Sequence, residues 1–255
     1  MKKPMTQEER FVQMIETPVS TLIPRLAVPT IISMLVTAIY NMADTFFVSQ
    51  IGTSASGAVG VMFSAMAMIQ AIGFTLGMGS GNYISRSLGD RNGGEAEKSA
   101  ATAFFTALII GALISVFGLM CLRPLVFLLG ATETIAPYAM DYGKYILIAA
   151  PFMMSSFVMN NILRAQGNAM YSMIGITTGG VLNMILDPIL IFGFDMGIAG
   201  AAIATMMSQM ISFGILFYQC NFREGSIRMR LSKFTPTGKM YGEILYAGLP
   251  FFCRQ

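Results

Sequence analysis

Asp44 and Asp187 are each isolated within long stretches of sequence that contain no charged side chain. Residues 26–43 and 45–85 flank Asp44 without a charge, and residues 165–186 precede Asp187 without one. An ionised carboxylate in hydrocarbon is unfavourable by about 3 to more than 10 kcal/mol, so such residues persist where they face a polar cavity and bind a charge. The pair therefore predicts a cation or proton site in a membrane transporter. The alternative is that each acid lies at a helix end among lipid headgroups.

The composition favours an all-α membrane protein. Of the 255 residues, 55% are hydrophobic and 11% are charged, whereas a soluble domain has about 25% charged residues. A membrane-spanning helix needs roughly 20 mostly apolar residues, and several runs here reach that length. The chain contains no histidine, which excludes HExxH metalloproteases and histidine-activated nucleophiles. We therefore expect that the protein is not an enzyme and has no cofactor. We also expect no nucleic-acid partner, since the basic residues lie in short loops between the spans.

The hydropathy pattern divides the chain into four parts. We expect a cytoplasmic amphipathic arm at 1–20, a transmembrane bundle at 21–220, a cytoplasmic basic loop at 221–240 and the start of a seventh helix at 241–255. Within the bundle, a tight turn is expected at 52–56, and Arg123-Pro124 is expected to end the third span. The six predicted spans are 22–50, 58–87, 95–122, 145–163, 169–192 and 198–219, and a polar helical approach that starts at Thr132-Glu133 leads into the fourth.

The distribution of basic residues predicts the orientation in the membrane. The N-terminal arm and the loops after the second, fourth and sixth spans hold 13 Lys and Arg, while the opposite loops hold only Arg123 and Lys144. By the positive-inside rule we expect a cytoplasmic N-terminus, and we expect the protein to lie in the cytoplasmic membrane. Pro29 and Pro250 both open an apolar helix after a basic segment. We read this as the start of a second six-helix repeat of a twelve-helix transporter, cut off at the end of the chain.

Several oxygen-bearing side chains are expected at one depth of the bundle. Asp44, Asp187 and Thr205 each lie within about seven residues, or roughly 10 Å, of the outer ends of their spans. Asn183 lies one turn before Asp187, on the same helix face. Pro188 lacks an N–H and is expected to bend its helix, which leaves a carbonyl for a hard cation such as Na⁺. Asn183 and Thr205 are alternatively interhelical hydrogen-bond partners, and Pro188 is alternatively a simple kink.

The sequence also offers residues for a substrate cavity and for helix packing. Flexible methionines and aromatic rings suit a pocket for apolar or cationic organic compounds. The candidate cavity residues are Tyr40, Asn41, Phe63, Met66, Gln70, Met159, Asn160 and Gln209. Small residues recur every fourth position from Gly73 to Gly89, a stripe that is typical of close helix packing.

Five segments carry a resemblance to a known family. They are NMADT at 41–45, SRSLG at 85–89, RAQGN at 164–168, NMILDP at 183–188 and GIAGAAIAT at 197–205. In this order and spacing the chain resembles the multidrug and toxic compound extrusion (MATE) family. The resemblance covers the chain from its first span onward, and the chain departs from the family pattern by stopping at the start of span seven.

The resemblance implies two six-helix bundles that face each other across a central cleft. It implies export of drugs and other organic, often cationic, compounds, driven by inward flow of Na⁺ or H⁺, with the second bundle as the missing partner. The implied cation site consists of Asp44, Asn183, Asp187 and Thr205.

Two alternative functions remain. A lipid or lipid-linked oligosaccharide flippase of a related fold would line its cleft with several cationic residues, and an intramembrane aspartyl protease would place its acids in Tyr-Asp and Gly-X-Gly-Asp contexts that are absent here.

Overall fold

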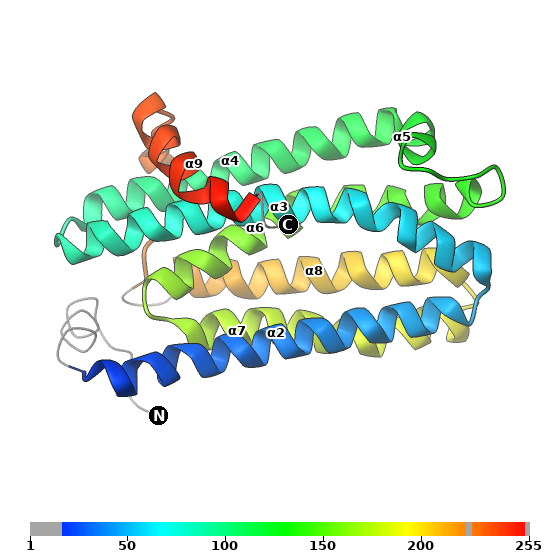
Figure 1. Cartoon of the computed structure of the whole chain (residues 1–255), viewed down its shortest axis with the longest axis horizontal. Helices are drawn as coiled ribbons and strands as arrows, with labels where there is room; N and C mark the ends of the chain where they lie inside the picture. The colour runs from blue at the N-terminus through cyan, green and yellow to red at the C-terminus, as the bar shows by residue number, and fades with distance from the viewer. Residues whose placement is uncertain (1–16, 223–225, 253–255) are drawn as a thin grey trace.

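The computed structural model describes residues 17–222 and 226–252, with the side chains of 251 and 252 excepted. Six of its helices are long and apolar enough to cross a membrane, which confirms the predicted six-span all-α bundle. They lie side by side with their long axes roughly aligned (Figure 1). The elements in chain order are α2 Val19–Ser49, α3 Thr53–Gly89, α4 Gly93–Met120, α5 Leu122–Leu128, α6 Ala136–Ala165, α7 Ala169–Pro188, the π-helix η1 Ile189–Gly193, α8 Gly197–Asn221, the 3₁₀-helix η2 Leu231–Lys233 and α9 Gly238–Phe252.

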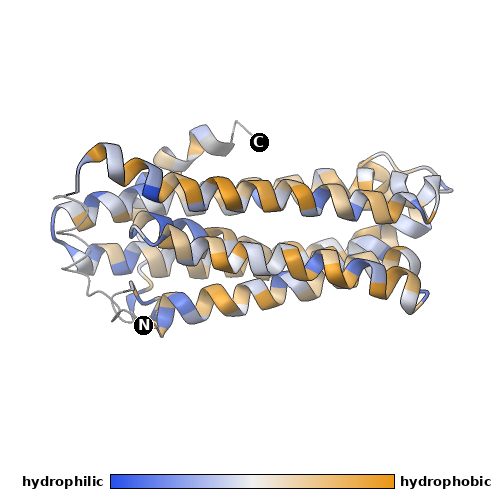
Figure 2. Ribbon diagram, turned by 90° about the horizontal axis from the view of Figure 1, so that it is seen from below, coloured by the Kyte–Doolittle hydropathy of each residue, from blue (hydrophilic) through white to orange (hydrophobic). Residues whose placement is uncertain are grey.

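Hydrophobic residues occupy the middle of the bundle, and hydrophilic residues gather towards its two ends (Figure 2). This arrangement matches the apolar core and polar faces of a bilayer, in which a spanning helix satisfies its own backbone hydrogen bonds. The hydropathy of the helices therefore explains both their length and their common direction.

Helix α6 is the centre of the bundle and packs against α3, α4 and α8. Glycines allow the close approach of its neighbours. A Cβ on Gly77 of α3 would lie 2.8 Å from Asn161 Nδ2, and one on Gly111 of α4 would lie 2.5 Å from Pro151 Cα. The predicted small-residue stripe of α3 thus contacts α6 at Gly73, Gly77 and Gly81, and small residues serve here as the packing surface that membrane helices use.

Helix α2 lies at the edge of the bundle and packs mainly on α7. The contact is close at Gly180, where a Cβ would lie 2.9 Å from Tyr40 Cδ1. On its outer face, a row of large apolar side chains is more than half exposed: Ile31, Leu35, Ile39, Met42 and Phe46. Such a face meets lipid or another apolar helix surface.

The segment from 226 to 237 forms a strap across one end of the bundle, a feature that the predicted loop at 221–240 did not anticipate. Ile227 and Met229 are buried and join the main apolar core. Helix α9 then crosses α3 (Figure 1), so close that a Cβ on Gly79 would collide with the Ile244 carbonyl. Thr102 and Thr235 exchange hydrogen bonds at 3.4 and 3.2 Å and hold the strap to α4.

Several predicted boundaries were wrong. The turn expected at 52–56 ends at Gly52, because residues from Thr53 onward already belong to α3. Arg123-Pro124 was expected to end the third span, but α4 already ends at Met120, and the pair lies in the first turn of α5, where proline is tolerated. The helical approach to the fourth span, predicted to start at Thr132-Glu133, begins at Ala136 and continues without a break into the apolar part of the helix. The N-terminal arm, predicted at 1–20, lies mostly outside the described residues, and Val19 and Ser20 belong to α2.

Candidate functional site

A buried polar cluster joins α7 to α8. The amide nitrogen of Asn183 donates to Asp187 Oδ1 at 3.2 Å and to Thr205 Oγ1 at 3.2 Å. Asp187 is fully buried, and Asn183 and Thr205 are nearly so. Gly175 and Gly179 on the same face of α7 let α8 approach, and Ser212 donates to the Gly175 carbonyl at 2.9 Å. The structure thus brings together three of the four residues predicted for the cation site.

The fourth predicted residue, Asp44, lies on α2 near this cluster. It is half-buried, and its charge acts electrostatically on Asp187. Asp44 Oδ1, Asn183 Oδ1 and Asp187 Oδ2 are buried and have no hydrogen-bond partner among the described residues. Buried acceptors without partners are unfavourable by about 1–3 kcal/mol each, more where the group is charged. Oxygen acceptors of this kind are the ligands that Na⁺ or a proton would use.

Tyr142 of α6 belongs to the same cluster, although no sequence pattern singled it out. Its side chain is buried, interacts with Thr205 and lies within the electrostatic reach of both Asp44 and Asp187. Its hydroxyl also lies 3.9 Å from the sulfur of Met66. The prediction missed Tyr142 because it placed the apolar part of this span after residue 144. A tyrosine before that point is typical of the membrane interface.

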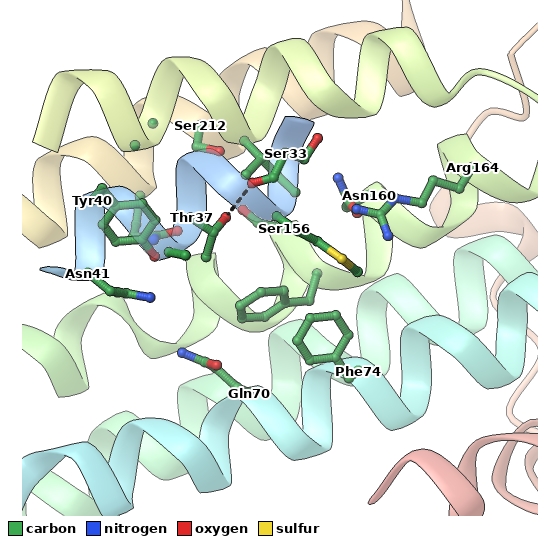
Figure 3. Close-up of a pocket in the computed structure, with 17 residues that line it drawn as sticks. Ser33, Thr37, Tyr40, Asn41, Gln70, Phe74, Ser156, Asn160, Arg164 and Ser212 are labelled. Carbon is green, nitrogen blue, oxygen red and sulfur yellow. Dashed lines mark hydrogen bonds between the residues drawn. The ribbon is translucent and has the colours of Figure 1, made fainter. Parts of the chain in front are cut away.

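A cavity of about 320 Å³ lies beside the cluster and is lined by residues of α2, α3, α6, α7 and α8. Polar side chains point into it from several helices (Figure 3). Tyr40 lies between the two features, because it lines the cavity and stands one helical turn before Asp44 on α2. Five of the eight predicted cavity residues line it: Tyr40, Asn41, Gln70, Asn160 and Gln209.

The other three predicted cavity residues lie elsewhere. Phe63 is 61% exposed and does not line this cavity. Met66 packs against both apolar cores, and Met159 is fully buried within one of them. Met and Phe fit cores, lipid-facing surfaces and cavities equally well, so their residue type alone could not separate these environments.

A positively charged side chain that the prediction missed also lines the cavity. Arg164, in the last turn of α6, lines one end of it, and its Nε donates to Ser172 Oγ at 3.2 Å. Asn160 donates to the same hydroxyl. The motif RAQGN contains Arg164, but its composition indicates a loop, whereas the structure places the arginine in the last turn of a helix.

The helix that carries Asp187 changes its geometry immediately after Pro188. The α-helical pattern gives way to η1, in which the Phe194 N–H donates to the Ile189 carbonyl at 3.0 Å. Proline removes one helical hydrogen bond, and π-helical turns occur where that ladder is interrupted. A Cβ on Gly200 of α8 would lie 2.8 Å from the Leu190 carbonyl oxygen, so α8 packs directly on this segment.

The family model described as MatE matches residues 29–189. The chain belongs to the MatE family of multidrug and toxic compound extrusion transporters. The match begins at Pro29 in α2 and ends just after Pro188. It therefore includes Asp44, Asn183 and Asp187, whereas Thr205 lies beyond it.

Among curated relatives, the chain is similar to Multidrug export protein MepA of two staphylococci. It is 29% identical to the Staphylococcus aureus protein over 96% of this chain and 55% of the relative. It is 32% identical to the Staphylococcus saprophyticus protein over 89% of this chain and 50% of the relative. The chain thus spans about half the length of the curated relatives it matches.

Solved structures show the same relationship. One is a multidrug resistance MATE family transporter of the MOP superfamily in an outward-facing conformation, which matches with a TM-score of 0.88 and 30% identity over 99% of this chain and 55% of that chain. A second is a MOP superfamily transporter from Pyrococcus furiosus, described as having a binding pocket of reverse polarity, with the same TM-score, identity and coverage. The six-helix bundle therefore corresponds to about half of each of these transporters.

Proposed function

We propose that this chain is the N-terminal bundle of a cation-coupled antiporter that exports organic, often cationic, compounds across the cytoplasmic membrane. The coupling ion is Na⁺ or H⁺, and the N-terminus is cytoplasmic. The observation that carries the proposal is the position of the acid cluster. Three buried oxygens without partners among the described residues, on Asp44, Asn183 and Asp187, lie next to a cavity large enough for part of a small molecule.

Tyr40 provides the physical link between the two sites. It lines the cavity and stands one helical turn before Asp44, and its ring packs against Gly180 of α7. A cation held between Asp44 and Asp187 would draw α2 towards α7 and press Tyr40 against that glycine. A substrate in the cavity would favour the opposite displacement. Each ligand then stabilises one arrangement through its differential affinity for the two.

The cluster also supports a role for the α7–η1 junction. Asp187 directly precedes Pro188, after which the helix has π geometry. Interrupted helices are common where transporters bind ions at membrane depth, because the freed backbone groups line a polar cavity. In this proposal, Asn183 and Thr205 orient Asp187, while Pro188 lets the outer end of α7 bend as the cation leaves.

The experiment that tests the proposal is coupled transport in proteoliposomes. The chain, joined to a second six-helix bundle of the same family, is reconstituted with a fluorescent cationic dye, and an imposed Na⁺ or H⁺ gradient drives exchange. We expect dye movement against its own gradient that depends on Asp187. Dye movement that is independent of both ion gradients would overturn the antiport proposal. Movement of labelled lipid in place of dye would favour a flippase.

A further inference from the structure

Arg164 is a positive charge in the wall of the cavity, and the cation site does not use it. Among the residues that the structure describes, no carboxylate lies within ion-pair distance of its guanidinium. Its one hydrogen bond to a described residue is from Nε to Ser172 Oγ at 3.2 Å. A guanidinium has five N–H donors in a planar fork. The other four therefore have no protein acceptor in the described part of the chain.

Ser172 holds the guanidinium in place. Its hydroxyl is buried and receives hydrogen bonds from both Arg164 and Asn160. Both donors lie one turn apart on α6 and line the cavity, and Ser156 continues the same row one turn earlier. The arginine is thus oriented before any ligand binds, which lowers the entropic cost of ordering its side chain on binding.

The cavity is polarised along its length. Arg164 and Asn160 lie at one end, and Tyr40 and Asn41 lie at the other (Figure 3). The α2 residues that line it extend from Ser33 to Asn41, a rise of roughly 12 Å. Asp44 lies one further turn along α2, so the acids stand at the end opposite to the arginine.

We propose that Arg164 binds an anionic group of the substrate and selects amphoteric compounds that carry a carboxylate at one end and an amine at the other. The carboxylate accepts two hydrogen bonds from the fork of the guanidinium, the pairing for which arginine is best suited. The amine lies up to about 12 Å away, towards Tyr40 and the acids. The apolar part of the molecule packs against Phe74 and Phe157, whose rings lie 4.6 Å apart.

This assignment deepens the proposed function and rests on its substrate cavity. Arginine at the end of a spanning helix also has an ordinary structural role, because it complements the helix dipole and anchors the helix near the headgroups. The two roles differ in one measurable respect. A structural arginine affects all ligands equally, whereas an anion-binding arginine affects only ligands that carry the negative charge.

The test compares two dyes that differ in a single charge. A rhodamine free acid carries a cationic ring system and a carboxylate, and its methyl ester keeps the cation but loses the carboxylate. Their binding to the purified 255-residue chain in lipid nanodiscs is measured by fluorescence anisotropy, which requires no transport. We expect Arg164→Gln to weaken binding of the acid by roughly tenfold to a hundredfold and to leave the ester within about twofold.

Two variants serve as controls. Arg164→Lys keeps the charge but lacks the planar fork, so the acid should bind with intermediate affinity. Arg86→Gln removes an exposed cation outside the cavity and should change neither dye. Ester binding that matches the original chain shows that Arg164→Gln is folded. Equal losses for acid and ester in Arg164→Gln, or no loss for either, would overturn the inference while leaving the antiport proposal intact. Failure of both dyes to bind the original chain would overturn the cavity itself.

Discussion

Asn183 donates one amide hydrogen to Asp187 on its own helix and the other to Thr205 on α8, both at 3.2 Å. The amide therefore has no donor left, and its carbonyl oxygen has no partner among the described residues. In this arrangement Asn183 fixes the rotamer of the buried acid and adds its own oxygen to those of Asp44 and Asp187. Through Asn183, helices α7 and α8 are both connected to the carboxylate of Asp187.

The first prediction concerns Asp187 itself. Asp187→Asn keeps the shape of the side chain and removes the charge, so we expect coupled exchange in proteoliposomes to fall more than tenfold. The thermal unfolding midpoint should change by no more than a few degrees, because the isosteric amide can still pair with Asn183. Normal exchange by a well-expressed Asp187→Asn protein would show that the cation site lies elsewhere.

The second prediction separates the hydroxyl of Thr205 from its methyl group. Thr205→Val removes the acceptor for Asn183 while preserving shape, and leaves an N–H unsatisfied in a buried site, which is unfavourable by about 1–3 kcal/mol. Since the freed amide can then rotate away from Asp187, we expect Na⁺ affinity, measured by calorimetry, to fall about tenfold. Thr205→Ser keeps the hydroxyl, so its Na⁺ affinity should fall by less than threefold. Equal effects of the two substitutions would mean that packing, rather than the hydrogen bond, is what matters.

The third prediction concerns the packing of α4 on α6. A Cβ on Gly111 would lie 2.5 Å from Pro151 Cα and 3.0 Å from Pro151 N, and backbone atoms cannot move aside as a side chain can. Gly111→Ala should therefore destabilise the bundle by about 1–3 kcal/mol and lower its thermal midpoint in detergent. On α8, a Cβ added to Gly214 would have no neighbouring atom within 4 Å among the described residues. Gly214→Ala is the matched control and should be neutral or slightly stabilising, since alanine favours the helix.

The fourth prediction concerns the strap formed by residues 226–237. Gln166 Oε1 accepts a hydrogen bond from the Ile227 N–H at 3.0 Å, and Gln166 is buried where α6 meets α7. Gln166→Met preserves length but leaves that N–H without its acceptor, so we expect the strap to open more often. Limited proteolysis within the strap should become several times faster. Gln50→Met, at the exposed end of α2, should leave the cleavage rate unchanged.

The sequence was informative about the acids and much less so about what surrounds them. Asp44 and Asp187 could be found because a charge within a long apolar run is rare, and helical spacing then placed Asn183 beside Asp187. Spacing does not give the rotation of one helix against another. Met159 and Phe63 therefore looked as suitable for the cavity as Asn160, although Met159 is buried in a core and Phe63 is exposed outside the cavity.

Helix ends were the second gap in what could be predicted. Tyr142 and Arg164 flank the apolar part of α6, where hydropathy does not indicate how deep in the bundle a polar side chain lies. The structure places Tyr142 in the acid cluster and Arg164 in the cavity wall. Both side chains have long stems that carry a polar group some distance into the bundle, so their depth depends on packing that hydropathy does not report.

The last prediction concerns the linkage between cation and substrate. If Tyr40 responds to both the acids and the cavity, then substrate binding must weaken Na⁺ binding, and Na⁺ must weaken substrate binding by the same factor. We expect a factor of about 5 to 150, the usual range for such coupling. Protons compete for the same carboxylates, so lowering the pH should weaken Na⁺ binding as well. Calorimetric titration of a cationic dye with and without Na⁺, at two pH values, measures both effects.

Tyr40→Phe and Gly180→Ala test the route of this linkage. Tyr40→Phe keeps the ring against α7 but removes the hydroxyl, so we expect both ligands to bind while the coupling factor falls. Gly180→Ala places a methyl group within 2.9 Å of the Tyr40 ring, which opposes the arrangement that holds α2 against α7. It should therefore weaken Na⁺ binding more than dye binding. Dye affinity that is indifferent to both Na⁺ and pH in the original protein would refute antiport, because no shared equilibrium would then connect the two sites.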